Sequence, residues 1–261
     1  MRQVPENGEA SARTLLPYGF VGDGRLSRHW RHYFSSLQIP WKLWSRRAAG
    51  GTDRASSMDP ARALEACAVV LLAVSDDAIE PVLGQLRAAG LHDRSFVHFC
   101  GGRSFEGAFG AHPLMSFGTR LYEPAFYPQI PVFVDQNARW PDPVAHFRAL
   151  FPQLANPCFS LRTEDKAFYH ALCSLAGGLT AVLWRDFFAA MAERYGAPRA
   201  ALASYPRRII ENVLESADSA LTGPVARGDN GTIRAHLEAL DGSALAAVYQ
   251  AFIAAAGRER A

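Results

Sequence analysis

The first half of the chain alternates short apolar runs with stretches of helical spacing. Apolar side chains recur at helical spacing over 25–37 and 77–89, which predicts two helices. Continuous apolar runs predict strands at 18–21, 41–44, 69–74, 96–99 and 132–134. This alternation is typical of a parallel sheet covered by helices. The segment 101–131 is rich in glycine, proline and aromatic residues, so we expect long loops there, on the ligand side of the sheet.

From Thr163 onward the pattern changes to helices. Thr163 is a candidate N-cap, and two acidic residues follow it in the first turn. Further helices are expected at 198–221, 232–240 and 243–256. The expected fold class is therefore α/β, with an N-terminal parallel sheet that has helices on both faces and an all-α C-terminal domain. The expected parts are a mobile tail at 1–14, a sheet domain at 15–160 and a helical domain at 161–261.

Charge and cysteine content exclude several classes of protein. The net charge is +2, and the charges are interspersed rather than clustered on a basic face, so neither nucleic acid nor an anionic membrane is an expected partner. No signal peptide or membrane span is expected. Four cysteines without a CxxC pair indicate neither a zinc ribbon nor a disulfide scaffold, and we expect no metal site and a reduced, cytoplasmic protein.

A glycine-rich turn lies between the first predicted strand and the first predicted helix. It has the pattern GxGxxS, a variant of the dinucleotide-binding fingerprint. The two glycines permit a sharp turn and a close approach to a pyrophosphate at the helix N-terminus, and the last position must be small for packing. The candidate cofactor-binding residues here are Gly22, Asp23, Gly24, Arg25 and Leu26, followed by the small Ser27.

The end of the second predicted strand selects between the two nicotinamide cofactors. NAD-specific sites place an acidic residue there, whereas this chain has Ser45, Arg46 and Arg47. A hydroxyl and guanidinium groups suit a 2′-phosphate, so NADP(H) is the expected cofactor. The alternative is a solvated basic turn in a chain with 25 arginines and only two lysines.

Several segments together carry a family resemblance: 22–27, 71–79, 97–101, 111–117 and 221–229. The chain resembles uncharacterised Rossmann-like proteins with a C-terminal helical domain of unknown function. That family is distantly similar to pyrroline-5-carboxylate reductase, ketopantoate reductase and the 6-phosphogluconate dehydrogenase group. The resemblance implies an NADP-binding Rossmann domain, a helical second domain, a homodimer, and a small-molecule substrate in a cleft between the domains.

The resemblance also implies roles for residues that follow two of the predicted strands. Val74, Ser75 and Asp77 fall where such folds line the nicotinamide side of the cofactor, although Asp77 could equally cap the next helix. Cys100 stands where the family tends to have serine, and is a candidate for substrate contact. It is also a conceivable nucleophile.

The first helix of the second domain carries two candidate proton donors. Lys166 and His170 are four residues apart and therefore share one helix face. In related reductases a lysine on such a helix polarises or protonates the substrate, because hydride addition develops charge that a donor must neutralise. The family's usual asparagine aligns with Gly177 or Gly178 here, which is a departure from the pattern. An exposed lysine and a packing histidine are the alternatives.

Loop residues complete the set of candidates. His112 is a candidate general acid or a contact for a substrate carboxylate, or else a structural histidine. Arg227 is a candidate clamp for an anionic substrate. His29 and His32 are expected at the surface.

The pattern as a whole favours an NADP(H)-dependent oxidoreductase that transfers hydride to or from a small carbonyl or imine substrate. The alternative is a non-catalytic NADP-binding or sensor protein, which the missing asparagine and Cys100 would suit.

Overall fold

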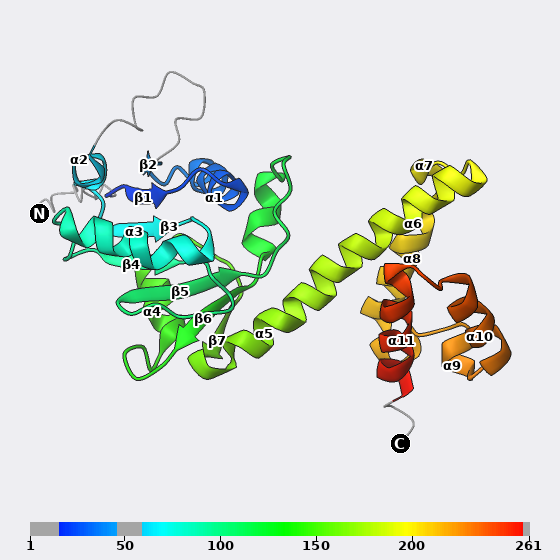
Figure 1. Ribbon diagram of the computed structural model, residues 1–261. Coiled ribbons are helices and arrows are strands. Elements are labelled where there is room, and N and C mark those ends of the chain that lie inside the picture. Colours follow the sequence, from blue (N-terminus) through cyan, green and yellow to red (C-terminus); the bar gives the residue numbers. More distant parts are fainter. Residues whose placement is uncertain (1–15, 46–58, 258–261) are drawn as a thin grey trace, which may run out of the picture. The chain divides into compact units, whose positions relative to one another are not determined.

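The structure is a computed structural model that describes residues 16–45 and 59–257 (Figure 1). The chain forms two compact units that divide between Leu179 and Thr180. The first unit contains the sheet and the second is helical. The expected tail at 1–14, together with Arg46 and Arg47, lies outside the described residues. The expected functional division at residue 160 stays a prediction.

The described part of the chain forms one seven-stranded sheet in the order β2-β1-β3-β4-β5-β6-β7. The strands are β1 (Tyr18–Val21), β2 (Trp41–Trp44), β3 (Val69–Leu72), β4 (Ser95–His98), β5 (Ala108–Pro113), β6 (Val132–Gln136) and β7 (Cys158–Arg162). Strands β1 to β5 are mutually parallel. Strand β6 is antiparallel to β5, and β7 is parallel to β6, so the last two strands run in the opposite direction.

The expected α/β fold is confirmed, with differences in the middle of the chain. The segment 101–131 is not all loop, because it contains β5 and a 3-10 helix, Pro124–Gln129. Glycine and proline within β5 conceal its apolar pattern. Strand β7 was also not foreseen, because its exposed outer positions interrupt the apolar run.

Helices cover both faces of the sheet, which is why its central strands are apolar on both sides. In the first unit they are α1 (Arg25–Ser36), α2 (Pro60–Leu64), α3 (Asp76–Ala88) and α4 (Pro143–Leu150). One core packs α1 and α4 against inward side chains such as Phe20 and Leu71. The other packs α2 and α3 against Val70 and Leu72 (Figure 1).

One continuous helical run leads from β7 out of the first unit. It comprises a 3-10 turn (Thr163–Asp165), α5 (Lys166–Cys173), a π-helical turn (Ser174–Leu179) and α6 (Thr180–Tyr195). The expected capping by Thr163 is wrong: Arg162 occupies the N-cap, and its guanidinium pairs with Asp165 at 2.7 Å. By length and composition alone, this run is also long and apolar enough to cross a membrane, although no membrane span was expected from the sequence.

The second unit consists of α6 and shorter helices. These are α7 (Arg199–Leu202), α8 (Ser204–Glu215), α9 (Pro224–Arg227), α10 (Asn230–Ala239) and α11 (Ala244–Ala256), with a 3-10 turn at Ala217–Ser219. Trp184 and Tyr205 make edge-to-face ring contact at 5.7 Å, which joins α6 to α8. No described residue between 180 and 257 is buried within the single chain.

His29 is buried, so its expected place at the surface was wrong. Its ring nitrogens lie 2.9 Å from the Tyr127 hydroxyl and 3.0 Å from the Gly118 carbonyl oxygen. The segment between β5 and β6 covers α1 there and excludes solvent. His32 is half-buried against the same tyrosine ring.

Candidate functional site

Gly22 makes the turn from β1 into α1 possible. Its φ of +100° lies in the left-handed region, and a Cβ there would come within 2.5 Å of the Ala73 carbonyl oxygen. Any side chain at this position would therefore strain the backbone and collide with the end of β3. The first glycine of the predicted fingerprint thus allows the end of β1 to lie close to the end of β3.

Gly24 is different, because nothing in the described protein crowds it. It is the N-cap of α1, with φ −74°, and a Cβ there would meet no atom within 4 Å. The first turn of α1 contains no acidic residue, and no side chain caps it. Its backbone N–H groups are therefore open to an anion, as the N-terminus of a phosphate-binding helix requires. Gly24 thus leaves open space at the N-terminus of α1, where the cavity described below begins.

Asp23 carries a negative charge within this turn, and two arginines of α1 offset it. Its carboxylate forms a close ion pair with Arg31 and lies 3.5 Å from Arg28. The Arg31 guanidinium also lies over the ring of Trp41, 5.0 Å from its centroid. This arrangement fixes the turn and limits the repulsion that Asp23 would exert on a phosphate. Arg25, also in the first turn, is exposed.

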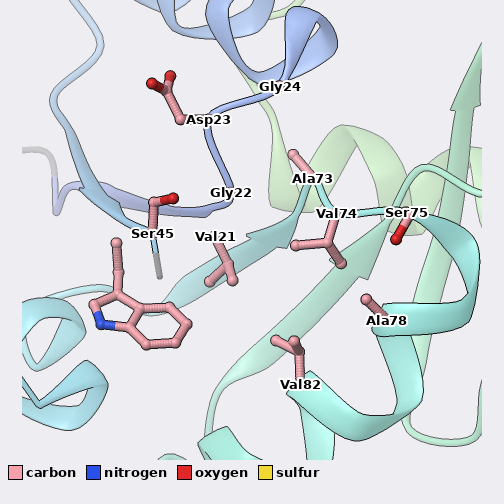
Figure 2. Close-up of a pocket in the computed structure, with 11 residues that line it drawn as sticks. Val21, Gly22, Asp23, Gly24, Ser45, Ala73, Val74, Ser75, Ala78 and Val82 are labelled. Atoms are coloured by element: carbon pink, nitrogen blue, oxygen red, sulfur yellow. The ribbon is translucent and has the colours of Figure 1, made fainter. Parts of the chain in front are cut away.

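A cavity of about 620 Å³ lies beside the turn. Its lining residues come from the ends of β1, β2 and β3 and from α3 (Figure 2): Val21, Gly22, Asp23, Gly24, Trp44, Ser45, Ala73, Val74, Ser75, Ala78 and Val82. Strands β1 and β3 are neighbours in the sheet. The chain continues from β1 to β2 in one direction along the sheet and from β3 to β4 in the other direction. Ligands of open α/β sheets bind at such switch points, outside the carboxyl ends of the strands.

The cavity includes most of the predicted cofactor-binding residues. Ser45 follows β2 and lines the cavity with a hydroxyl where NAD-specific sites have a carboxylate. Val74 and Ser75 line it from the end of β3 (Figure 2). Asp77 does not line it; its exposed carboxylate pairs with Arg103 at 2.7 Å. Asp77 does not cap α3 either, since Ser75 is the N-cap.

The turn after β4 lies beside the start of α3. The Asp76 carboxylate lies near the Cys100 thiol, and burial together with this carboxylate raises the pKa of the thiol. A thiol with a raised pKa is a poor nucleophile, which does not favour the nucleophile hypothesis. Asp76 directly follows Ser75, so the turn at Cys100 borders the Ser75 end of the cavity.

Three polar side chains gather against this turn: His112 of β5, and Tyr169 and His170 of α5. The Tyr169 hydroxyl lies 2.8 Å from His112 Nδ1, and the two histidine rings are 5.6 Å apart between centroids. Burial, with the neighbouring charges of His170 and Lys166, lowers the pKa of His112 to about 4. Burial raises the pKa of Tyr169 far above its ordinary value. Both side chains are therefore neutral at physiological pH.

Lys166 is buried beneath the same turn rather than exposed, with 1% of its side-chain surface accessible. Its ammonium donates a hydrogen bond to the Cys100 carbonyl oxygen at 3.0 Å and forms a close ion pair with Asp135 of β6. Asp135 also accepts a hydrogen bond from Ser104 at 2.9 Å. The two groups that accept hydrogen bonds from the Lys166 ammonium thus come from β6 and from the turn after β4.

His98, at the end of β4, completes the buried polar group. Its Nδ1 accepts a hydrogen bond from the Cys100 N–H, and its Nε2 lies 3.8 Å from the Asp135 carboxylate. Burial and the charge of Lys166 lower the pKa of His98 to about 3, so the ring is neutral. No group of described side chains is suited to hold a metal ion.

The remaining positions that the sequence singled out are Arg227, Gly177 and Gly178. Arg227 belongs to the second unit, where its guanidinium pairs with Asp229 at 2.7 Å. Gly177 and Gly178 fall in the π-helical turn, and a Cβ at either would meet no described atom within 4 Å.

Sequence reasoning missed Tyr169, Asp135 and Asp76. Asp135 had a detectable signal, since a carboxylate in the apolar run 132–136 needs a cationic partner when that run is a buried strand. Tyr169 stands next to a candidate histidine, but only the structure shows that its hydroxyl reaches β5.

Comparisons with known proteins agree with this architecture. Residues 133–256 match the family model described as a domain of unknown function, DUF2520. A Bacteroides fragilis protein provisionally assigned as an NADP oxidoreductase superposes with a TM-score of 0.73 at 18% identity, over 94% of this chain and 98% of that one.

Two enzymes of known activity have the same fold. An imine reductase of Streptomyces aurantiacus gives a TM-score of 0.63 at 16% identity, over 93% of both chains. Pyrroline carboxylate reductase of Plasmodium falciparum, solved with NADP bound, gives 0.56 at 14% identity, over 94% of this chain and 96% of that one. No curated protein sequence matches the chain. The resemblance predicted from sequence is confirmed: the chain has this Rossmann-like fold, and its residues 133–256 match the DUF2520 model.

Proposed function

We propose that the protein is an NADP(H)-dependent oxidoreductase that transfers hydride to or from a small carbonyl or imine substrate. The observation that carries this proposal is the cavity at the β1–β3 switch point, with the open N-terminus of α1 at one end and Ser75 at the other. Structurally similar proteins include NADP-bound and imine-reducing enzymes, which supports the same chemistry here. When bound, the cofactor would supply the hydride.

The residues of this chain would divide the remaining work. The Gly22–Gly24 turn and the first turn of α1 would hold the pyrophosphate. Ser45 and, outside the described residues, Arg46 and Arg47 would hold the 2′-phosphate. Val74 and Ser75 would line the nicotinamide side. His112 and His170 would lie beside the substrate near Cys100.

Gly24 offers a sharp test of cofactor binding. Gly24→Ala should leave the unliganded fold intact, because its Cβ meets open space at an ordinary φ. It should weaken NADPH binding at least tenfold, because the new methyl group would occupy the space that the pyrophosphate needs. Calorimetric titration with NADPH and NADH measures both affinity and cofactor preference. The matched control is Gly84→Ala, because Gly84 lies on α3 and is equally uncrowded.

The outcomes are distinct. Wild-type protein that shows no heat with NADPH contradicts the proposed function. Gly24→Ala protein that binds NADPH like the wild type contradicts the assigned position of the pyrophosphate.

The alternative, a non-catalytic NADP sensor, is favoured by the glycines at the place of the family's asparagine. Turnover separates the two functions. Protein that binds NADPH but oxidises none of it across ketoacids, ketones and cyclic imines would be a sensor.

We also propose that the protein is a homodimer. No described side chain of 180–257 is buried within one chain, although a stable helical unit needs buried apolar surface. Large apolar side chains remain exposed on the long helical run, including Phe168 at 70% and Leu175 at 58%. A second copy would cover such surfaces. Sedimentation equilibrium tests this, and a monomer at micromolar concentration would contradict it.

A further inference from the structure

Tyr169 is one of the side chains of this region that no sequence pattern singled out. It lies on the first turns of α5, over the face of the sheet that carries Phe133 and His112, which are directly paired on β6 and β5. Its ring is 4.7 Å from that of Phe133, and its hydroxyl reaches His112 Nδ1 at 2.8 Å. Two strands and a helix therefore fix the position of one phenolic hydroxyl.

Gly101 shows how closely this cluster is built onto the turn after β4. A Cβ at Gly101 would come within 2.7 Å of His170 Cδ2 and 2.9 Å of His112 Cδ2. Only glycine lets both rings approach the backbone of the turn. The same turn carries Cys100, whose thiol lies near Asp76. The Tyr169–His112 pair thus stands at the carboxyl edge of β4 and β5, and the turn at Cys100 connects it to Asp76, which directly follows the cavity residue Ser75.

Lys166, the donor that related reductases suggest, is engaged elsewhere. Both hydrogen bonds shown for its ammonium go to the protein, one to Asp135 and one to the Cys100 carbonyl oxygen. Releasing it toward a substrate would leave the buried Asp135 carboxylate without its cation, which is strongly unfavourable. Lys166 is therefore placed to support the turn, and a different group must supply the proton.

We propose that Tyr169 is the proton donor of the proposed reductase and that His112 holds and recharges it; this inference rests on the proposed function. As the substrate carbon accepts hydride from the reduced cofactor, the C=O or C=N π electrons move to the oxygen or nitrogen. Tyr169 gives its Oη proton to that atom. His112 Nδ1–H, hydrogen-bonded to Oη, restores the phenol while Nε2 takes a proton from solvent. Hydride and proton together complete the reduction.

The neutrality of both side chains suits this sequence of steps. A neutral His112 can carry its proton on Nδ1 and still accept one on Nε2, whereas an imidazolium could not accept a second proton. A phenol with a raised pKa stays protonated until a strong base appears beside it. The alkoxide or amide anion that develops during hydride addition is such a base.

Tyr169→Phe tests the donor role, with Tyr195→Phe as the matched control. Tyr195 ends the same helical run and is 71% exposed. The full-length protein is assayed for NADPH oxidation with three probes: cyclohexanone, 2-methyl-1-pyrroline and pyruvate. We expect Tyr169→Phe to lower kcat about 100-fold or more. The affinity for NADPH should stay unchanged within about twofold. The solvent deuterium isotope effect on NADPH oxidation, which the wild type should show, should be lost in this variant. Tyr195→Phe should behave like the wild type.

His112 acts through Tyr169, so its test requires rescue by a conservative variant. An asparagine amide can still donate a hydrogen bond near the Nδ1 position, whereas leucine cannot. We expect His112→Asn to retain at least tenfold more kcat than His112→Leu. Equal losses in the two variants would reduce His112 to a packing role and overturn its part in the proposal.

The failures are distinguishable. Wild-type turnover that persists undiminished in Tyr169→Phe overturns the donor role and leaves the oxidoreductase function standing. Wild-type protein that binds NADPH but oxidises it with none of the three probes overturns both.

Discussion

Replacing Lys166 by methionine removes one charge of a fully buried ion pair with little change in side-chain length. The Lys166 and Asp135 side chains are each 1% exposed, so water cannot solvate the carboxylate that remains. Breaking a buried pair in this way costs about 3–5 kcal/mol. In a unit of this size, each kcal/mol of lost stability lowers Tm by about 2–4 °C, so we expect Tm to fall by about 6–20 °C. Loss of the hydrogen bond to the Cys100 carbonyl oxygen adds to this.

Urea unfolding at pH 7, followed by circular dichroism, measures the change. The double variant Lys166→Met/Asp135→Leu should recover most of the lost stability, because no buried charge then remains unpaired. Lys42→Met, at the only other lysine and on an exposed position of β2, should change stability by less than about 0.5 kcal/mol. A Lys166→Met protein as stable as the wild type would refute the buried pair and return Lys166 to the list of free donors.

Other predictions concern the same cluster. Burial lowers the pKa of His98 to about 3 and the pKa of His112 to about 4, whereas both have a pKa of 6.5 in the unfolded chain. As the pH falls, the unfolded chain therefore binds more protons than the folded protein. The free energy of unfolding should therefore decrease from about pH 6.5 downward, by up to ~1.4 kcal/mol per pH unit for each histidine. Midpoints of urea unfolding that stay constant between pH 7 and 5 would contradict this. Reductive methylation of native protein, read by mass spectrometry, should modify Lys42 and spare Lys166, with both modified after unfolding. Gly101→Ala should force the two histidine rings apart, so nitrogen NMR of His112 should report loss of the bond to Tyr169; an unchanged spectrum would refute the crowding.

The sequence predicted the central strands of the N-terminal half of the sheet well because they are buried on both faces. Such strands read as continuous apolar runs, and β1 begins and ends at the expected residues. Strand β2 lies at the edge of the sheet and is partly exposed, and its expected bounds are also correct. The later strands were harder to predict. Strand β5 contains Gly110, where a Cβ would collide with the Asp135 carboxylate, so its composition serves a close approach rather than strand propensity.

The glycine turn was predictable because its chemistry is local: strand, glycines and helix adjoin in sequence. The polar cluster around the turn after β4 could not be predicted in this way, because its residues come from β4, β5, β6 and α5 and meet only after folding. Lys166 illustrates the limit. Its position on the first helix after the sheet was found correctly, but only the structure shows that Asp135 lies opposite its ammonium.

A crystal structure of the full-length protein with NADP⁺ tests the central claim most directly. We predict the pyrophosphate at the N-terminus of α1 beside Gly24, and the nicotinamide ring beyond Ser75 on the side of the Tyr169–His112 pair. A pyrophosphate bound away from α1, or a nicotinamide facing away from Tyr169, would contradict it.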